Sequence, residues 1–400
     1  MIGAGIAAVL SAIGVAQAIA GWIAVRRFAD RCRRAGVNAV RPVTVLKPLH
    51  GDEPLLEEAL TSVCRQVYPP LQVVFGVNDA ADTALPVVRR LQARFPGCDI
   101  AVVVEPTGHG ANRKVGNLIN MLPAAKHDVL VIADADMHVA PDWLHRLVVA
   151  LDEPGVGLVT TVYTGVPAYP LPLPPSREGR GRAVLAPPPL AGGGCGEGAL
   201  AALGAAQINH YFLPGALLAR AMGRQDCLGA TMMLRRQTLE RIGGFAALVE
   251  HLADDNVLGR LVQGLGLRVA LAETIPSTTV PETSLRALWR HELRWARTIR
   301  TLVPLQFAAS VLQYPLVWAA LAVLLGSGAG WTLAWFVLAW AIRAVAAHGI
   351  DRALALANRT PLWLLPLREL MSVVVMAASY TGRRVEWRGH TLEAEGFKPR

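Results

Sequence analysis

The chain begins with a long apolar segment that is followed at once by a basic one. Residues 1–25 contain no charged side chain, and the next residues read RRFADRCRR. About 20 apolar residues are enough to cross a bilayer as a helix. A cleaved signal peptide is the alternative, because AQA at 16–18 resembles a cleavage site, but such peptides carry their positive charge before the apolar segment. We therefore predict a transmembrane anchor over residues 1–27, with the N-terminus outside and Arg26 onward in the cytoplasm.

From residue 43 to residue 161, short apolar runs rich in Val and Ile alternate with helical patterns. The runs are VTVLKPL, LQVVFGVND, DIAVVVEP and DVLVIADAD, and the helical patterns include EPLLEEALTSVCRQ and TALPVVRRLQARF. This alternation predicts a parallel sheet with helices on both faces. Ligands of such sheets gather at the carboxyl ends of the strands. We therefore expect Asp79, at the end of the second run, to point into one crevice with Asp134 and Asp136, at the end of the fourth.

Pro, Gly and Arg dominate residues 168–198, where no periodicity survives. We predict a low-complexity insertion there, with a functional lid as the less favoured alternative. Ordered sequence is expected to resume near Ala201, and LERIGGF at 239–245 predicts a helix closed by glycine.

Apolar segments return after Arg300. Residues 302–325 and 331–347 predict two spans joined by a glycine-rich turn, whereas the third apolar stretch, 361–380, is interrupted by Arg368 and Glu369. With the N-terminus outside and two spans after Arg300, the tail is cytoplasmic only if the third stretch does not cross the membrane and is re-entrant or interfacial. The sequence does not decide whether the third stretch crosses. The predicted organisation is a membrane anchor at 1–27, a cytoplasmic catalytic domain at 28–300, membrane segments at 301–380 and a basic cytoplasmic tail at 381–400.

Composition supports a membrane protein with a sizeable soluble part, and we predict a multi-pass protein of the cell (inner) membrane. The apolar fraction is 53%, charged residues make up 17%, and the net charge is +9, a balance that fits membrane spans flanked by basic residues. A nucleic-acid binder is disfavoured, because aromatic residues are sparse and no zinc-finger or RNA-binding signature is present. Five scattered cysteines without a CxxC pair argue against a zinc site or a disulfide framework.

Four acidic or basic features are candidates for chemistry: Asp79, the Asp134/Asp136 pair, the Asp254/Asp255 pair, and HELRW at 291–295. Each also has a structural explanation. Asp79 suits a turn, an aspartate before a helix suits a cap, and HELRW suits an amphipathic helix at a bilayer surface. Two aspartates separated by one alanine are costly unless a cation lies between them, and a divalent cation with oxygen ligands is the usual remedy.

Aspartyl-nucleophile phosphatases share a DxD after a strand and a later acidic pair. They balance that charge with a lysine between the two, and this chain has none between Asp136 and Asp254. Met137 also stands where a Thr or Val is expected, so we reject that class.

The order D, DxD, DD and (H)xxRW resembles inverting membrane glycosyltransferases. Within that group VTVLKPLHGDEPLLEEAL at 43–60, FGVNDAAD at 75–82 and GANRKVGNL at 110–118 look like ceramide glucosyltransferases, most like the bacterial branch associated with hopanoid biosynthesis. The resemblance covers about residues 41–300 outside the insertion. It implies an α/β fold of the nucleotide-sugar-binding GT-A type, a Rossmann-like mixed sheet with flanking helices, and transmembrane helices at both ends.

The same resemblance implies roles for matching residues. Asp79 would bind the uracil of a UDP-sugar, Asp134 and Asp136 would hold Mg²⁺ or Mn²⁺ against the diphosphate, and Asp255, rather than Asp254, would be the base that deprotonates the acceptor hydroxyl. Arg294 and Trp295 would meet the diphosphate and the acceptor, and His291 opens that motif where Gln or Arg is more usual. Lys114 and Asn117 are implied as further nucleotide contacts.

The predicted function is transfer of a hexose or N-acetylhexosamine from a UDP-sugar to a hydroxyl of a membrane lipid, in contact with the phospholipid bilayer. The donor is UDP-glucose or UDP-N-acetylglucosamine, and the acceptor a hopanoid polyol or a ceramide-like lipid. Two alternatives are a processive polysaccharide synthase, which needs more spans, and an inactive membrane protein that only binds a nucleotide sugar.

Overall fold

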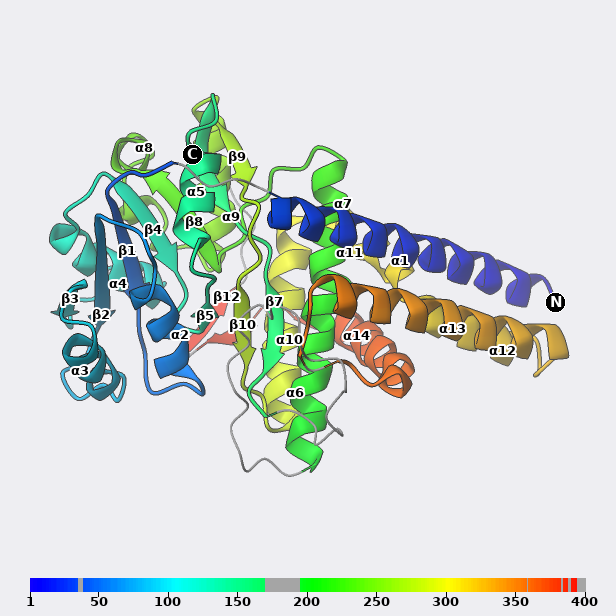
Figure 1. The fold of residues 1–400 in the computed structure, drawn as a ribbon. Helices are drawn as coiled ribbons and strands as arrows, with labels where there is room; N and C mark the ends of the chain where they lie inside the picture. Colours follow the sequence, from blue (N-terminus) through cyan, green and yellow to red (C-terminus); the bar gives the residue numbers. More distant parts are fainter. Residues whose placement is uncertain (35–38, 170–194, 358, 383, 388–389, 394–400) are drawn as a thin grey trace.

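The computed structural model describes residues 1–34, 39–169, 195–357, 359–382, 384–387 and 390–393. Three layers follow one another in Figure 1: a sheet domain, a middle layer of helices, and a bundle of long apolar helices that ends at the N-terminus.

The large sheet has seven strands in the order β3-β2-β1-β4-β8-β6-β9. They are β3 (Asp99–Val104), β2 (Leu71–Val77), β1 (Val43–Pro48), β4 (Val129–Ala133), β8 (Thr231–Arg235), β6 (Val156–Thr160) and β9 (Arg268–Leu271). The first four are the strands predicted from the apolar runs, and they are parallel. Strand β8 runs antiparallel to both β4 and β6. The sheet is therefore mixed, as the resemblance implied, and not all-parallel.

Helices cover both faces of this sheet because side chains alternate along each strand. In β1, Val43 and Val45 pack into the core beneath α2, α3 and α5, whereas Leu46 packs into the core beneath α4 and α9. The helices of this domain are α2 (Leu56–Cys64), α3 (Leu85–Arg94), α4 (Arg113–Met121), η1 (Leu122–Ala124), α5 (Trp143–Leu151), α8 (Arg236–Arg241), η3 (Phe245–Ala247) and α9 (Asp254–Gly264). Helix α8 is closed by Gly243 and Gly244, both with positive φ, as predicted.

A small second sheet and the middle layer separate the large sheet from the membrane helices. The small sheet has the order β5-β10-β7, with β5 (Met137–His138), β10 (Ser277–Val280) and β7 (Thr164–Pro167). The middle layer holds α6 (Cys195–Gln207), the π-helical turn η2 (Ile208–Phe212), α7 (Leu213–Ala221) and α10 (Leu285–Leu302). Asn209 of η2 exchanges two hydrogen bonds with the backbone of Gly165 in β7, at 2.8 and 3.0 Å, which fixes that strand to the middle layer.

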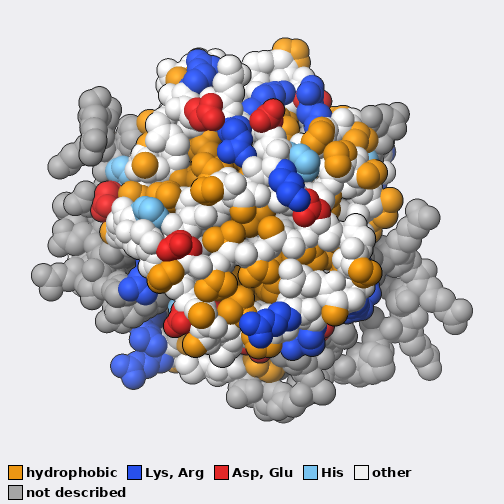
Figure 2. Space-filling view, turned by 90° about the vertical axis from the view of Figure 1, so that its left-hand side faces the viewer, with side chains coloured by type: hydrophobic (Ala, Val, Ile, Leu, Met, Phe, Trp, Pro, Cys, Tyr) orange, Lys and Arg blue, Asp and Glu red, His pale blue; other side chains and the backbone are white. Residues whose placement is uncertain are grey.

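Figure 2 looks onto the end of the sheet domain that lies away from the membrane helices. Charged side chains of both signs are interspersed there with apolar ones. The basic excess of the chain is therefore not concentrated on this face.

Among the residues that the structure describes, three helices are long and apolar enough to cross a membrane, or up to four if one bent pair is a single span. The bundle contains α1 (Ile2–Arg34), α11 (Pro304–Ala309), η4 (Ser310–Gln313), α12 (Pro315–Leu325), α13 (Gly330–Ala353), η5 (Leu362–Leu364) and α14 (Leu365–Ser379). The first helix continues to Arg34, past the predicted boundary at residue 27. Its buried Phe28 packs into the same apolar cluster as Leu217 of α7, so the end of the anchor is part of the folded core.

The predicted span over residues 302–325 is not a single straight helix. The chain bends by 67° between η4 and α12, where Pro315 cannot continue the hydrogen-bond ladder. The polar backbone at the bend is satisfied inside the protein: Ser11 donates to the Pro315 carbonyl at 2.8 Å, and the Leu316 N–H donates to the Glu369 carboxylate at 2.7 Å. Irregular backbone at membrane depth is tolerated only where protein covers it in this way.

The third C-terminal stretch passes the same length and composition test for a span, but its two charges point into the protein. Arg368 and Glu369 are fully buried. In Figure 1, α14 lies nearer the sheet domain than the α12–α13 turn does.

Arg368 joins α14 to α10 through a bidentate ion pair with Glu292, both N···O distances being 2.6 Å. Because removing one partner of a buried pair leaves an uncompensated charge, Arg368→Leu should destabilise the protein by about 3–5 kcal/mol. We expect a melting temperature several degrees lower in detergent. The double variant Arg368→Leu/Glu292→Leu should recover much of this loss, since replacing both charges removes the unpaired one. A double variant no more stable than either single one would contradict this account.

Two predicted segments lie partly outside the described residues. Residues 170–194 of the predicted insertion are among those not described. The insertion was predicted too long at both ends. Ala168 is buried and its N–H donates to Val280, and α6 already begins at Cys195, before the predicted restart near Ala201. The tail contains the antiparallel pair β11 (Arg384–Trp387) and β12 (His390–Glu393).

Candidate active site

The two aspartates after β4 do not lie on a continued strand, as their spacing had suggested. Strand β4 ends at Ala133, and a turn closed by a hydrogen bond from the Met137 N–H to the Asp134 carbonyl follows. The ammonium of Lys47, a lysine fully buried in β1, donates to the carbonyl oxygens of Asp134 and Ala135 at 2.9 and 3.3 Å. Burial lowers the pKa of Lys47 to about 8, although the charges of Asp136 and Asp134 oppose the shift. Lys47 therefore fixes the turn that presents both carboxylates.

Lys114 lies between the two acidic pairs. Its ammonium is 2.6 Å from the Asp134 carboxylate and 3.9 Å from that of Asp254, and it also donates to the Gly229 carbonyl at 3.5 Å. Burial alone would lower the pKa of Lys114, but the charges of Asp134 and Asp254 outweigh it and leave the pKa above its ordinary value. The lysine that the sequence lacks between Asp136 and Asp254 is thus supplied from α4, earlier in the chain.

Asp254 and Asp255 begin α9 but occupy different surroundings. Asp254 is buried, and its carboxylate faces the Asn112 amide at 3.4 Å as well as Lys114. The α9 N-terminus has no side-chain cap, so the helix-cap explanation for Asp254 is wrong. Asp255 accepts the Asn256 N–H at 2.7 Å through Oδ1, and its Oδ2 has no hydrogen-bond partner in the part of the chain that the structure describes.

The pKa of Asp255 suits a base. Burial raises it to about 6, and the neighbouring charge of Asp254 adds to the rise, while the Asn256 N–H and Lys114 oppose it. A general base works best when its pKa lies near the working pH. Asp255 therefore combines a free carboxylate oxygen with a suitable pKa.

Asp136 is the second carboxylate of the turn, and its oxygen accepts a short hydrogen bond from the Thr278 hydroxyl. Burial and the charge of Asp134 raise its pKa. The Asp134 side chain is 36% exposed, so a ligand can reach it. No group of three or more metal-binding side chains occurs among the described residues, but Mg²⁺ is commonly held by one or two carboxylates together with substrate phosphates and water. The pair therefore fits such a cation, which would relieve the repulsion between two acids.

Tyr163, just before β7, is a candidate that the sequence reasoning missed. Burial raises the pKa of its phenol most, the charges of Asp134, Asp255 and Asp136 raise it further, and the charge of Arg294 lowers it. The Tyr163 side chain therefore lies near all four of these charged residues. Its ring stacks at 4.8 Å on Phe212 of the π-helical turn. The only sequence signal was a tyrosine among the polar residues that follow a strand.

Helix α10 supplies the other side of the site. Trp295 packs with Tyr163 against Ile208 and Val280, and Arg294 lies close enough to Tyr163 to affect its phenol. His291 bonds the buried Glu282 through Nδ1, and its ring contacts Trp295 edge-on at 4.4 Å. Tyr163 therefore lies between the aspartates on one side and Arg294 and Trp295 on the other. The ring of His291 supports Trp295.

Asp79 and Asn117 stand apart from this group. Asp79 is exposed, and its carboxylate accepts the Ala81 N–H at 2.8 Å, which supports the turn explanation without testing a nucleotide contact. Asn117 is buried and donates to the Gly76 carbonyl of β2 at 2.8 Å. Its direct role is to fix α4, and with it Lys114, against the sheet.

Comparison with known proteins places this chain in a family. The family model described as Glycosyl transferase family 21 matches residues 6–172 and 189–396. The chain belongs to this family. The expected resemblance to ceramide glucosyltransferases is confirmed at this level, while the hopanoid-associated branch stays a prediction. The α/β fold with a GT-A-like mixed sheet and apolar helices at both ends, implied by the resemblance, is the fold found here.

Individual relatives of this family 21 protein match over limited regions. Ceramide glucosyltransferases of Candida albicans and Komagataella phaffii are 30% and 32% identical over 122 and 131 residues, which cover 28% and 32% of this chain and 22% and 26% of those enzymes. Ceramide glucosyltransferase 1 of Caenorhabditis elegans is 21% identical over 66% of this chain and 50% of its own length. The chain thus matches from about a quarter to half of these relatives.

Among solved structures, a mannosyltransferase from Pyrobaculum calidifontis in complex with GDP-Man and Mn²⁺ has 22% identity and a TM-score of 0.47. The match covers 93% of this chain and 99% of that one. TarS from S. aureus in complex with UDP-GlcNAc has 15% identity and a TM-score of 0.39, over 88% and 96% of the two chains.

Proposed function

We propose that this family 21 member transfers a hexose or N-acetylhexosamine from a UDP-sugar to a hydroxyl of a membrane lipid, with inversion at the anomeric carbon. The observation that carries the proposal is Asp255. Within the described part of the chain, one oxygen of its carboxylate has no hydrogen-bond partner, its pKa is raised, and the Lys114–Asp134 ion pair is a neighbour. The names of the ceramide glucosyltransferase relatives support a lipid acceptor.

In an inverting transfer, each residue of the site has a separate role. Asp79 binds the uracil, and Lys114 and Arg294 neutralise charge on the diphosphate, for which fixed cationic donors are suited. Asp255 takes the proton of the acceptor hydroxyl as that oxygen attacks the anomeric carbon from the face opposite the departing UDP. Tyr163 and Trp295 form the wall against which the acceptor is oriented. Asp134 and Asp136 would hold Mg²⁺ or Mn²⁺, which supplies further charge neutralisation on the departing diphosphate.

The acceptor reaches this site from the bilayer. Helix α10, which carries Arg294 and Trp295, packs on α14 through the Glu292–Arg368 pair. Its sequence, LRALWRHELRWARTIRTL, is basic and aromatic, which suits an anionic leaflet. We place the catalytic domain on the cytoplasmic side of the cell (inner) membrane, with the N-terminus on the other side.

The processive-synthase alternative is weaker, because the described part of the chain offers only three or four candidate spans to build a polymer channel. The inactive-binder alternative is weaker too, since both acidic pairs are brought to one site.

The test is a transfer assay with purified full-length protein in lipid nanodiscs. Radiolabelled UDP-glucose and UDP-N-acetylglucosamine are each offered with ceramide and with a hopanoid polyol, and the products are analysed by chromatography and mass spectrometry. We expect one donor–acceptor pair to give a monoglycosylated lipid of inverted anomeric configuration. A water-soluble polymer would favour the processive synthase, and binding of donor without any product would favour the inactive protein.

A further inference from the structure

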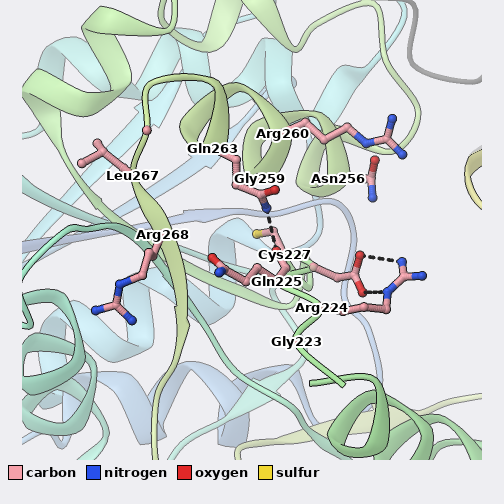
Figure 3. Close-up of a pocket in the computed structure, with 12 residues that line it drawn as sticks. Gly223, Arg224, Gln225, Cys227, Asn256, Gly259, Arg260, Gln263, Leu267 and Arg268 are labelled. Atoms are coloured by element: carbon pink, nitrogen blue, oxygen red, sulfur yellow. Dashed lines mark hydrogen bonds and ion pairs between the residues drawn. The ribbon is translucent and has the colours of Figure 1, made fainter. Parts of the chain in front are cut away.

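A cavity of about 490 Å³ lies apart from the carboxylates of the candidate active site, between the segment after α7, one side of α9 and the start of β9. Dashed lines in Figure 3 mark the bonds between its polar groups. Arg224 pairs with Asp226 at 2.7 and 2.8 Å, and Gln263 donates to the Gln225 carbonyl at 2.8 Å. These groups already have partners within the protein.

A second, much smaller cavity differs in this respect. It lies where the membrane bundle meets the middle layer, and we call it the bundle cavity. Its polar lining residues are Gln17 of α1, His210 and Tyr211 of η2, Gln313 of η4 and Arg343 of α13. It measures about 20 Å³, and roughly 10–15 Å³ is enough for one water molecule. The bundle cavity therefore has room for a single oxygen-sized group.

Several polar atoms of these lining residues have no partner among the described residues. Arg343 is 1% exposed and its Nη1 makes no hydrogen bond, and His210 is 4% exposed and its Nδ1 makes none. The side-chain amides of Gln17 and Gln313 make no hydrogen bond within the described ranges either. A polar group without a partner is costly at membrane depth, where bulk water does not replace the missing bond.

The charges around the bundle cavity are already compensated, so it suits a neutral ligand and not an ion. Arg343 lies 3.3 Å from the Glu369 carboxylate through Nε, and its Nη2 donates to the His210 carbonyl at 3.2 Å. His210 Nε2 lies 2.6 Å from the Asp351 carboxylate. Because Nε2 faces a carboxylate, it carries the proton of the neutral imidazole, which leaves Nδ1 as an acceptor. A donor on Arg343 and an acceptor on His210 match a hydroxyl group, which can both accept and donate.

The bundle cavity has the surface of α1 and α7 on one side and the turn η2 on the other. Ala18 and Leu218, its apolar lining residues on α1 and α7, are half-buried, so the cavity is reached from the surface of these two helices. Tyr211 lines the cavity, and the next residue, Phe212, stacks on Tyr163 at 4.8 Å. A ligand in the bundle cavity therefore contacts the same turn that supports the candidate active site.

We propose that the bundle cavity binds one neutral hydroxyl group, supplied either by a membrane lipid or by a water molecule. The hydroxyl oxygen accepts from Arg343 Nη1, its hydrogen is donated to His210 Nδ1, and the amides of Gln17 and Gln313 complete its hydrogen bonds. The proposal does not depend on the proposed reaction, because the test measures stability and lipid retention without a sugar donor.

The experiment compares the full-length protein with Gln17→Leu and with Gln306→Leu. Gln306 is an exposed residue of α11 that does not line the cavity, so its variant makes the same change elsewhere in the bundle. Each protein is placed in nanodiscs of phosphatidylcholine, a lipid without a hydroxyl group, and in nanodiscs that also contain diacylglycerol, which has one. Tryptophan fluorescence follows the melting temperature, and native mass spectrometry counts the diacylglycerol molecules retained.

The sign of the change in melting temperature separates the two possibilities. If no hydroxyl is bound, Gln17→Leu removes an amide without a partner and should raise the melting temperature or leave it unchanged. If a hydroxyl is bound, the variant loses a hydrogen bond, and we expect the melting temperature to fall by roughly 1–2 °C in a chain of this size. Gln306→Leu should not lower it.

The two kinds of nanodisc identify the source of the hydroxyl. A fall for Gln17→Leu that is already present in phosphatidylcholine identifies water. A fall that appears only with diacylglycerol, together with fewer diacylglycerol molecules retained by the variant, identifies a lipid hydroxyl. The proposal is overturned if Gln17→Leu lowers the melting temperature in neither kind of nanodisc, or if Gln306→Leu lowers it as much.

Discussion

Replacing Asp255 with Asn should lower turnover by roughly 10²–10⁴-fold, because an amide cannot accept the proton of the acceptor hydroxyl in the transition state. The substitution keeps the size of the side chain and leaves an Oδ1 that can still accept the Asn256 N–H. Donor affinity should change little, since Lys114 and Asp134 keep their ion pair. Turnover at saturating donor and acceptor, measured beside donor affinity, separates these two effects.

Asp254→Asn is the matched control, one residue away in the same helix. Asp254 faces Lys114 and Asn112, so its loss should act through the position of Lys114. We expect donor affinity to fall about tenfold, the order of a lost charge-assisted contact, with turnover nearly retained. If Asp254→Asn proves inactive and Asp255→Asn active, the base has been assigned to the wrong member of the pair.

The pH profile gives a second readout. A base functions only when ionised, and the pKa of Asp255 is raised to about 6, so kcat/KM should fall as the pH drops below that value. The residual activity of Asp255→Asn should lack this acidic limb. A limb that persists unchanged in the variant would belong to another group, such as Asp136, whose pKa is also raised.

The four parallel strands and their helices were predictable because their apolar periodicity is local. Strand β8 was not, since TMMLR is short and becomes a central strand only through pairing with β4 and β6, distant in sequence. The bend before Pro315 was missed for a related reason. Hydropathy alone does not show that Ser11 and Glu369 satisfy the backbone there.

The candidate site was predictable where residues carry unusual charge in an apolar context, as in the two acidic pairs. The roles of Lys47, Lys114 and Tyr163 depend on contacts with residues that are distant from them in the sequence. Lys114 in particular fills the gap between the acidic pairs from α4, which sequence order cannot show. Tertiary structure likewise decides whether an aspartate caps a helix or pairs with a lysine. Asp254, which faces Lys114 and does not cap α9, is an example.

Removal of divalent cations should lower transfer by about 10³-fold or more, because a metal that neutralises a departing diphosphate contributes several kcal/mol to the transition state. Mg²⁺ or Mn²⁺ added back after EDTA should restore the activity. Asp136→Asn should show the same loss and should also weaken Mn²⁺ binding, measured by electron paramagnetic resonance on the purified protein with UDP present.

Thr278→Val provides the control for that variant. It removes the hydroxyl that donates to Asp136 but keeps the carboxylate, so Mn²⁺ should still bind and activity should fall only modestly, by the order of one hydrogen bond. Lys114→Met sharpens the test, because Lys114 is the cation that pairs with Asp134 when no metal is bound. If Asp134 and Asp136 are metal ligands, Lys114→Met should bind Mn²⁺, measured without UDP, at least as tightly as the unaltered protein, since one competing positive charge is gone. Full transfer in EDTA, or Mn²⁺ affinity unaffected by Asp136→Asn, would show that these aspartates serve to position Lys114 and Thr278 and not to hold a cation.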